Sequence, residues 1–189
     1  MSHFETGRRY SYMDAESTPL REVRIAAPGF DFECVFREEY ACIVRVISRV
    51  VQDHARAQEL AAEVFWRLSR TPKAQGSRTS GWLYRTATRM ALDELRKSLR
   101  RVKYERLFSF GRPPRTPEEL YLENEEKWRV RLVLARLKKK DSELLVLRSN
   151  GLSYEEIAQA LDLNVSSIGT LLRRAEESFR KEYVRRNKT

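Results

Sequence analysis

The chain has 189 residues, with 37 Lys or Arg against 27 Asp or Glu, and its net charge is +10. Apolar residues make up 41% of it, while Gly and Pro number only 7 and 6. Scarce Gly and Pro favour helices over a turn-rich sandwich or barrel, and the basic excess favours a polyanionic partner. No apolar run reaches the roughly 18 residues of a membrane-spanning helix, and the first residues lack a signal-peptide core. We therefore expect a cytoplasmic protein that does not insert into membranes.

The two histidines and two cysteines, His3, His54, Cys34 and Cys42, do not have the spacing of metal ligands. Cys34 and Cys42 stand on one predicted helix, about 12 Å apart along its axis, which is too far for a disulfide within that helix. Neither histidine has a plausible catalytic partner in the sequence. We expect no metal, no cofactor and no catalytic residue.

The basic excess falls in two blocks. Residues 31–100 hold 13 basic and 9 acidic residues, and residues 128–189 hold 14 and 8. The neutral stretch between them contains FSFGRPPRTP (108–117), which is typical of a linker. The sequence thus predicts an all-α fold of two small helical domains joined by a flexible linker. The expected segments are a disordered tail (1–30), a helical domain (31–99), the linker (100–116) and a second helical domain (117–186).

Three amphipathic helices are predicted in the first domain. Apolar residues recur at spacings of 4, 3, 4 and 3 from Phe36 to Val50, and a second series runs from Ala57 to Leu68. After the breaker TPKAQGSRTSG (71–81), a third helix starts near Trp82. Its polar face carries a stripe that is either a DNA-binding surface or a solvated face with an Arg89–Asp93 pair. The stripe consists of Trp82, Arg85, Arg89, Asp93, Arg96 and Arg100.

The second domain opens with a capping-box pattern at Thr116 to Glu119, which predicts a helix from 117 to about 137. Asp141 can cap a short helix that ends before Asn150-Gly151.

A second capping box, Ser153 to Glu156, predicts a helix over 154–161, and Asn164 can cap a long helix from Val165 to about Tyr183. A short helix, a tight turn and a longer helix form a helix-turn-helix, whose second helix enters the major groove of DNA. Hydroxyl side chains can contact base edges, and arginines further along suit phosphates. The exposed positions of this helix are Val165, Ser166, Ser167, Gly169, Thr170, Arg173 and Arg174.

Two stretches resemble the bacterial sigma factors of the extracytoplasmic-function (ECF) class. FECVFREEYACIVRVISRVVQDHARAQELAAEVFWRLSR followed by GWLYRTATRMALDELRKSLRR is similar to their promoter-melting domain. GLSYEEIAQALDLNVSSIGTLLRRAEESFRKEY is similar to their upstream-element domain, with Asp162 in place of the usual turn glycine. The resemblance covers about residues 31–183, in the family's order.

The resemblance implies a non-enzymatic subunit that binds core RNA polymerase, directs it to promoters and melts the −10 element. Its partners would be core polymerase, double-stranded and locally melted promoter DNA, and an anti-sigma factor. The surface for the polymerase clamp would include Glu59, Glu63, Phe65 and Leu68, although the last two fit an apolar core as well.

The same resemblance assigns DNA contacts to three elements. The loop 71–80 would capture a flipped base of the −10 element, through Arg78, Thr79 and Ser80. The third helix would contact −10 DNA, and the last helix would read the −35 element. The implied −10 residues on the third helix are Trp82, Arg85, Arg89, Arg96 and Arg100; the −35 residues are Val165, Ser166, Ser167, Thr170, Arg173 and Arg174.

Two other functions fit parts of the pattern. A helix-turn-helix regulator that never joins polymerase would form dimers on palindromic sites, whereas a sigma factor is expected to be a monomer when free. A nuclease would need a convergent acidic metal site, but the acidic residues are scattered over helix faces.

Overall fold

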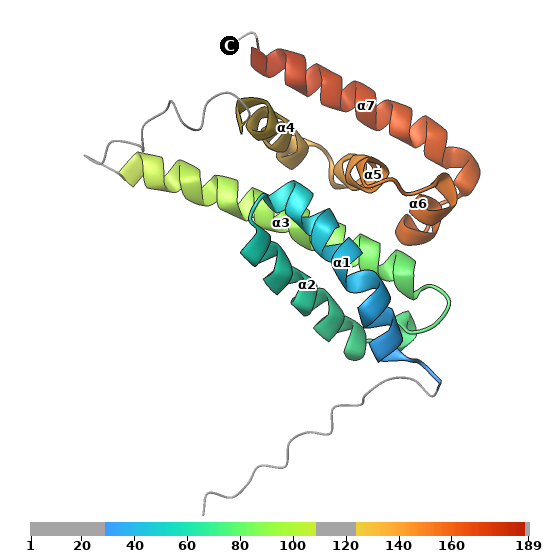
Figure 1. The fold of residues 1–189 in the computed structure, drawn as a ribbon. Coiled ribbons are helices and arrows are strands. Elements are labelled where there is room, and N and C mark those ends of the chain that lie inside the picture. Colours follow the sequence, from blue (N-terminus) through green and yellow to red (C-terminus); the bar gives the residue numbers. More distant parts are fainter. Residues whose placement is uncertain (1–28, 109–123, 188–189) are drawn as a thin grey trace, which may run out of the picture.

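The computed structural model describes residues 29–108 and 124–187, and the regular elements in that part of the chain are all helices, with no strand (Figure 1). An all-α fold is therefore confirmed. The expected tail (1–30) lies almost wholly outside the described residues, as do the Thr116–Glu119 capping box and residues 117–123. The elements are α1 (Phe32–Val51), α2 (His54–Ser69), the 3-10 turn η1 (Pro72–Ala74), α3 (Thr79–Phe108), α4 (Asn124–Arg136), α5 (Lys139–Ser149), α6 (Tyr154–Leu161) and α7 (Val165–Asn187).

Side-chain caps fix where several helices begin. The Asp31 carboxylate accepts a hydrogen bond from the Cys34 amide at 2.9 Å at the start of α1. Ser153 and Glu156 form the predicted capping box of α6, and Asn164 accepts from the Ser166 amide at 3.1 Å at the start of α7. These caps satisfy amides that have no partner within their own helix. The predicted cap at Asp141 is wrong, because α5 already begins at Lys139.

The first domain packs α1, α2 and α3 around one apolar core. Phe65 lies at its centre and is only 2% exposed. Its ring meets those of Phe36 and Tyr40 on α1, with centroids 4.9 and 5.9 Å apart. Such edge and tilted contacts add to the burial of the aromatic surface. The hydrophobic effect therefore holds α1 and α2 together.

The helix-turn-helix consists of α6 and α7 packed on α5. Leu147, Ile157 and Ile168 are fully buried in a shared core. Ala158 on α6 is 3% exposed in that core, in keeping with a small residue where helices cross. The α6–α7 turn passes through Asp162, which has the left-handed angles φ 56° and ψ 56°.

Helix α3 is longer than the sequence analysis expected. It begins at Thr79 instead of near Trp82, and it continues through Phe108, so residues 100–108 of the expected linker are helical. No proline or glycine interrupts residues 82–108, which explains why the helix does not stop at the predicted boundary. The rest of the linker lies in the part of the chain that is not described.

Helix α3 also brings the two domains together. In Figure 1, α2 lies below α3, α1 crosses α3 and α4 to α6 lie above it, and α3 contacts all five of these helices. Within residues 29–108 and 124–187, no helix has both the length and the apolar character needed to cross a bilayer.

The left-handed backbone at Asp162 gives a test of the turn. A left-handed conformation costs most L-residues about 1–2 kcal/mol, whereas glycine adopts it freely. We expect Asp162→Gly to keep the free energy of unfolding or raise it by up to about 1 kcal/mol, and Asp162→Val to lower it by about 1–2 kcal/mol. Urea denaturation of the three proteins checks this, and equal losses in both variants would contradict it.

Candidate nucleic-acid interface

The arginine stripe of α3 faces two environments. Arg100 is exposed and Arg85 is half-buried. Arg89 instead donates to the Glu143 carboxylate of α5, with Nε 2.9 Å from Oε1 and Nη2 3.3 Å from Oε2. Arg96 also points to the second domain, so two of the predicted DNA contacts are engaged by protein groups.

The ion pair expected within the stripe is different from the one observed. Asp93 accepts from Arg96 at 3.3 Å, whereas Arg89 reaches across to Glu143. The Glu143 side chain is only 4% exposed, and a buried carboxylate needs a charged partner. That need explains why the Arg89 side chain pairs with Glu143 of α5 and not with Asp93 on its own helix.

The loop before α3 is held by a buried threonine. Thr79 is 5% exposed, and its hydroxyl lies 2.9 and 2.8 Å from the carbonyl oxygens of Ala74 and Gly76, to which it can donate. The same oxygen accepts from the Gly76 amide at 2.8 Å. The expectation that Thr79 contacts DNA is therefore corrected to a role in shaping the loop. Arg78 and Ser80 are exposed on the same segment.

A groove of about 430 Å³ runs between the end of α2 and the exposed side of α3. Trp66 and Trp82 both line it, together with Arg67, Arg70 and Arg89 among other residues. Lys139 adds a fourth cation and Asp93 is its single carboxylate, so the lining carries a net positive charge. Aromatic rings among cations are the usual lining of a single-stranded nucleic-acid site.

Trp66 was missed by the sequence analysis. It is 55% exposed, and the Arg70 guanidinium carbon lies 4.6 Å from its ring centre. The signal was present in the sequence, because position 66 falls outside the apolar stripe that runs through Val64, Phe65 and Leu68 on α2. The Trp66 ring therefore lies open to solvent among the cations of the groove, where a base can stack on it.

The exposed face of α2 carries the carboxylates expected at the polymerase clamp. Glu59 pairs with Arg56 at 2.7 Å, and Glu63 pairs with Arg67. Phe65 and Leu68 are 2% and 0% exposed, so the expectation that their side chains face polymerase is corrected. They belong to the core because they lie on the helix face that packs against α1 and α3.

The first turns of α7 are open to solvent. Val165 is 42% exposed, and Gly169, which is half-buried, lies beside the Tyr154 ring. The other predicted −35 residues are all exposed: Ser166, Ser167, Thr170, Arg173 and Arg174. The structure thus presents this set together on one helix end, as the helix-turn-helix pattern predicts.

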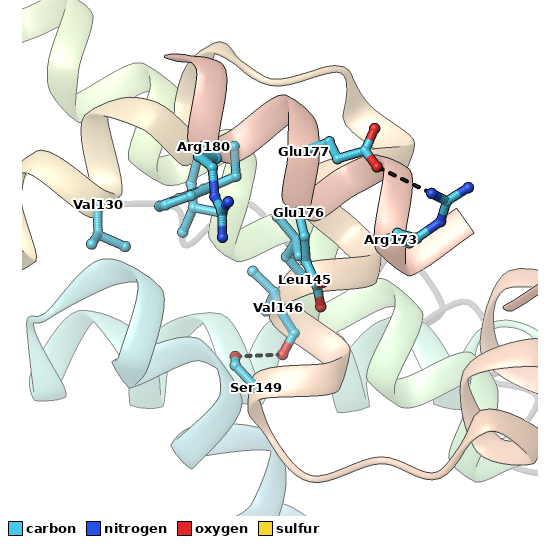
Figure 2. Close-up of a pocket in the computed structure, with 10 residues that line it drawn as sticks. Val130, Leu145, Val146, Ser149, Arg173, Glu176, Glu177 and Arg180 are labelled. Atoms are coloured by element: carbon cyan, nitrogen blue, oxygen red, sulfur yellow. Dashed lines mark hydrogen bonds and ion pairs between the residues drawn. The ribbon is translucent and has the colours of Figure 1, made fainter. Parts of the chain in front are cut away.

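The second domain also contains an apolar groove of about 680 Å³ between α4, α5 and α7 (Figure 2). Val130, Leu145 and Val146 supply part of its lining, and the Arg173–Glu177 ion pair lies at its edge. Three separate helices form it, so no single sequence motif indicated it.

Two ionisable groups of the first domain have perturbed pKa values. Burial raises the pKa of the Tyr84 phenol, and the nearby Glu39 carboxylate adds to the rise. A hydrogen bond from Arg56 lowers the pKa of Glu94, whose carboxylate lies 3.1 Å away. Among residues 29–108 and 124–187, no cluster of His, Cys, Asp or Glu could hold a metal ion.

Comparison with protein families matches residues 35–101 to sigma-70 region 2 and residues 127–178 to sigma-70 region 4. The two matches together span well over half of the chain, in the order that the resemblance implied. The chain belongs to the sigma-70 family. Between the two regions lie residues 102–126, which are too few for a further domain. A sigma factor with regions 2 and 4 alone has the ECF arrangement, so that prediction is confirmed.

Other comparisons add little to this assignment. No curated protein matches the sequence of this sigma factor significantly. Among solved structures, the sigma factor RpoE from Bartonella quintana, crystallised with the anti-sigma factor NepR, is similar at 17% identity and a TM-score of 0.48. The match covers 80% of this chain and 96% of that one.

The buried hydroxyl of Thr79 predicts how the region 2 loop of this sigma factor responds to mutation. Thr79→Val keeps the shape but removes the hydroxyl that partners the buried Ala74 carbonyl and the Gly76 amide, and a buried polar group without a partner costs about 1–3 kcal/mol. We expect a lower free energy of unfolding and faster amide exchange in residues 74–79, measured by denaturation and hydrogen exchange. Thr79→Ser retains the hydroxyl and serves as the control. Unchanged exchange in Thr79→Val would contradict the assignment.

Proposed function

We propose that this sigma factor reads the −10 element with α3 and the loop before it, and the −35 element with α7. The observation that carries this proposal is the positive groove to which region 2 contributes two tryptophans and three arginines, on the same chain as an exposed recognition helix in region 4. A helix-turn-helix regulator that never joins polymerase needs only the exposed recognition helix. The proposed domains are residues 31–108 and about 117–186, with the linker between them.

At the −10 element, the proposed task is to hold unstacked bases. Unstacking costs a few kcal/mol, and each base stacked on an aromatic ring recovers about 1–3 kcal/mol. Trp66 and Trp82 offer such rings, and Arg70 and Arg85 offer positive charge for the strand. Other proposed contacts are Arg78, Ser80, Arg89, Arg96 and Arg100.

At the −35 element, the first turns of α7 would enter the major groove. Ser166, Ser167 and Thr170 can exchange hydrogen bonds with base edges, and Val165 offers an apolar contact. Arg173 and Arg174 would bind phosphates, which position the protein without reading sequence.

For polymerase, we propose that the exposed face of α2 is the contact surface. Glu59 and Glu63 are four residues apart, so they lie on one face of the helix, whereas Trp66 lines the groove assigned to DNA. Buried Phe65 and Leu68 support this face from behind.

The remaining properties follow from this role. We propose that the protein performs no chemistry of its own, uses no cofactor, acts in the cytoplasm where polymerase and DNA are found, and is a monomer when free. An anti-sigma factor is proposed as its regulator, as the family resemblance implies. Co-purification of a tagged chain from its host tests whether an anti-sigma factor binds it. Size-exclusion chromatography of the free protein tests whether it is a monomer.

Reconstitution with bacterial core polymerase tests the function itself. We expect co-elution on a sizing column and, from fragmented genomic DNA, transcripts that start downstream of a shared two-part motif. The alternative, a helix-turn-helix regulator, requires dimers and palindromic sites. DNA binding without any polymerase binding, with cognate core and no anti-sigma factor present, would favour that alternative.

Separate surfaces for DNA and polymerase predict separable defects. Arg85→Ala combined with Arg89→Ala should reduce promoter opening at least tenfold, because two cations are lost from the −10 face, while co-elution with core polymerase is kept. Glu59→Lys should instead weaken co-elution with core polymerase, and promoter opening should fall with it. Permanganate footprinting and sizing measure the two properties, and an equal loss of both in the Arg85/Arg89 variant would contradict the division.

The exposed ring of Trp66 gives a sharper test of the groove. Trp66→Ala should weaken binding of the polymerase complex to forked DNA with a single-stranded −10 element by about 1–3 kcal/mol, the value of one base stack. Trp66→Phe should retain most of the affinity. Binding to fully duplex −35 DNA is the internal control. Equal affinity of Trp66→Ala and the parent for the fork would rule out stacking at this position.

A further inference from the structure

The groove between α2 and α3 reaches the start of α5 and has the size of a small-molecule site. Its volume is about 430 Å³, and small-molecule sites occupy about 300–1,000 Å³. A second hollow of about 290 Å³ shares Arg89 and Lys139 with it and is also lined by Lys140 and Glu143. The two hollows therefore meet where Arg89 and Lys139 both supply positive charge.

One part of the groove offers a ring on which a base can stack. Trp66 is 55% exposed, and the Arg70 guanidinium carbon lies 4.6 Å from its ring centre. Trp82, on α3, adds a second ring to the lining. Stacking on an aromatic ring accepts any base, because every base has a π-face. This part of the groove therefore selects for a planar ring and not for a particular sequence.

The lining carries more positive charge than one nucleotide of a DNA strand can neutralise. A strand brings one phosphate charge per nucleotide, whereas a nucleoside triphosphate brings several charges to one place. The lining has a single carboxylate, that of Asp93, which accepts a hydrogen bond from Arg96. Its four cations are Arg67, Arg70, Arg89 and Lys139. The surplus of cations therefore favours a ligand whose phosphates are clustered.

Two of the four cations can receive phosphates without losing an ion pair. Among residues 29–108 and 124–187, no carboxylate pairs with Arg70 or Lys139. Arg89, in contrast, is held by the nearly buried Glu143 carboxylate. Guanidinium and ammonium groups bind phosphate through short, charge-assisted hydrogen bonds. Arg70 and Lys139 are therefore the expected phosphate ligands.

The α3 wall adds a hydroxyl group to the lining. Thr86 lines the groove, and in the described part of the chain its hydroxyl makes no hydrogen bond. Thr71, which also lines the groove, instead donates to the Arg67 carbonyl at 2.8 Å. A threonine hydroxyl can both donate and accept, so Thr86 offers a contact for a ribose hydroxyl or a phosphate oxygen.

We propose that this groove binds a free nucleoside triphosphate, with its base on the Trp66 ring and its phosphates at Arg70 and Lys139. Binding of a free nucleotide goes beyond the proposed function, which requires only that unstacked bases of a DNA strand reach the groove. Both ligands use the Trp66 ring, so a bound nucleotide occupies the place of a −10 base.

Isothermal titration calorimetry of the full chain with magnesium-free ATP, at constant ionic strength, tests the binding. ATP should bind at least tenfold more tightly than AMP, because its additional phosphates meet the surplus cations. It should also bind at least tenfold more tightly than tripolyphosphate, which has no base to stack. Absence of ATP binding would overturn the site. Equal affinity for ATP and either of the other two ligands would overturn the assignment of a nucleoside triphosphate.

Two variants test the base and the phosphates separately. Trp66→Ala should weaken ATP binding at least fivefold, which is the lower end of the value of one base stack, while Trp66→Phe should retain most of it. Lys139→Gln should weaken ATP binding at least threefold. Lys181→Gln is the matched control, since it removes an exposed lysine of α7 outside the groove, and it should bind ATP as the parent does. Thermal denaturation confirms that each variant is folded. If folded Trp66→Ala or Lys139→Gln binds ATP as tightly as the parent, the proposed placement is overturned.

Photocrosslinking locates the bound nucleotide. We expect 8-azido-ATP to label peptides from residues 66–70 or 82–90, and excess unlabelled ATP to suppress the label. Label confined to other segments would overturn the placement. Co-elution with core polymerase is scored separately. A chain that joins polymerase but binds no ATP contradicts this inference alone, whereas a chain that binds ATP but never joins polymerase contradicts the sigma function alone.

Discussion

Burial of one side of α3 against α1 and α2 forces the arginines of its other side into a single stripe. The helix cannot turn these side chains inward, since Leu83, Ala87 and Leu95 already fill the core side. A row of cations on a rigid helix attracts whatever negative or carbonyl-rich surface is nearest. In the polymerase complex that surface would be the DNA strand, and in the free chain it is the second domain.

The arginines between the two domains show how one residue type can bind groups of different kinds. A guanidinium can bind a carboxylate or a phosphate with two hydrogen bonds, and it can also close the carbonyl end of a helix. Arg89 uses the first mode with Glu143, while Arg49 and Arg131 use the second. The contact of Arg89 satisfies a nearly buried carboxylate, which would otherwise lose its hydrogen bonds.

In the first domain, buried aromatic residues pack the core and the exposed Trp66 lines the groove. Phe65 joins the rings of α1 and fixes the position of α2. Trp66, the next residue, points outward because one step along a helix turns a side chain by about 100°. Packing of Phe65 in the core therefore directs the Trp66 ring into the groove. Trp82, which packs partly against the same core, lines the groove from α3.

Much of the architecture could be predicted from the sequence. The apolar spacing located the helices, the Ser153–Glu156 box located α6, and the family resemblance located regions 2 and 4. The predicted −35 residues share one exposed helix end, because residues close in sequence on a helix are also close in space. The start of α3 and the burial of Thr79 were missed, since both depend on how the loop packs. The exposure of Trp66 was also missed, although its position outside the apolar stripe of α2 indicates it.

The sequence by itself determined most of the helices, the caps at Ser153 and Asn164 and the stripe of arginines on α3, all of which depend on neighbours within a few residues. Only the tertiary structure decided what those arginines contact. Arg89 and Glu143 are 54 positions apart, and no local pattern relates them. Their pairing depends on the packing of α5 against α3, where a nearly buried carboxylate requires a cation beside it.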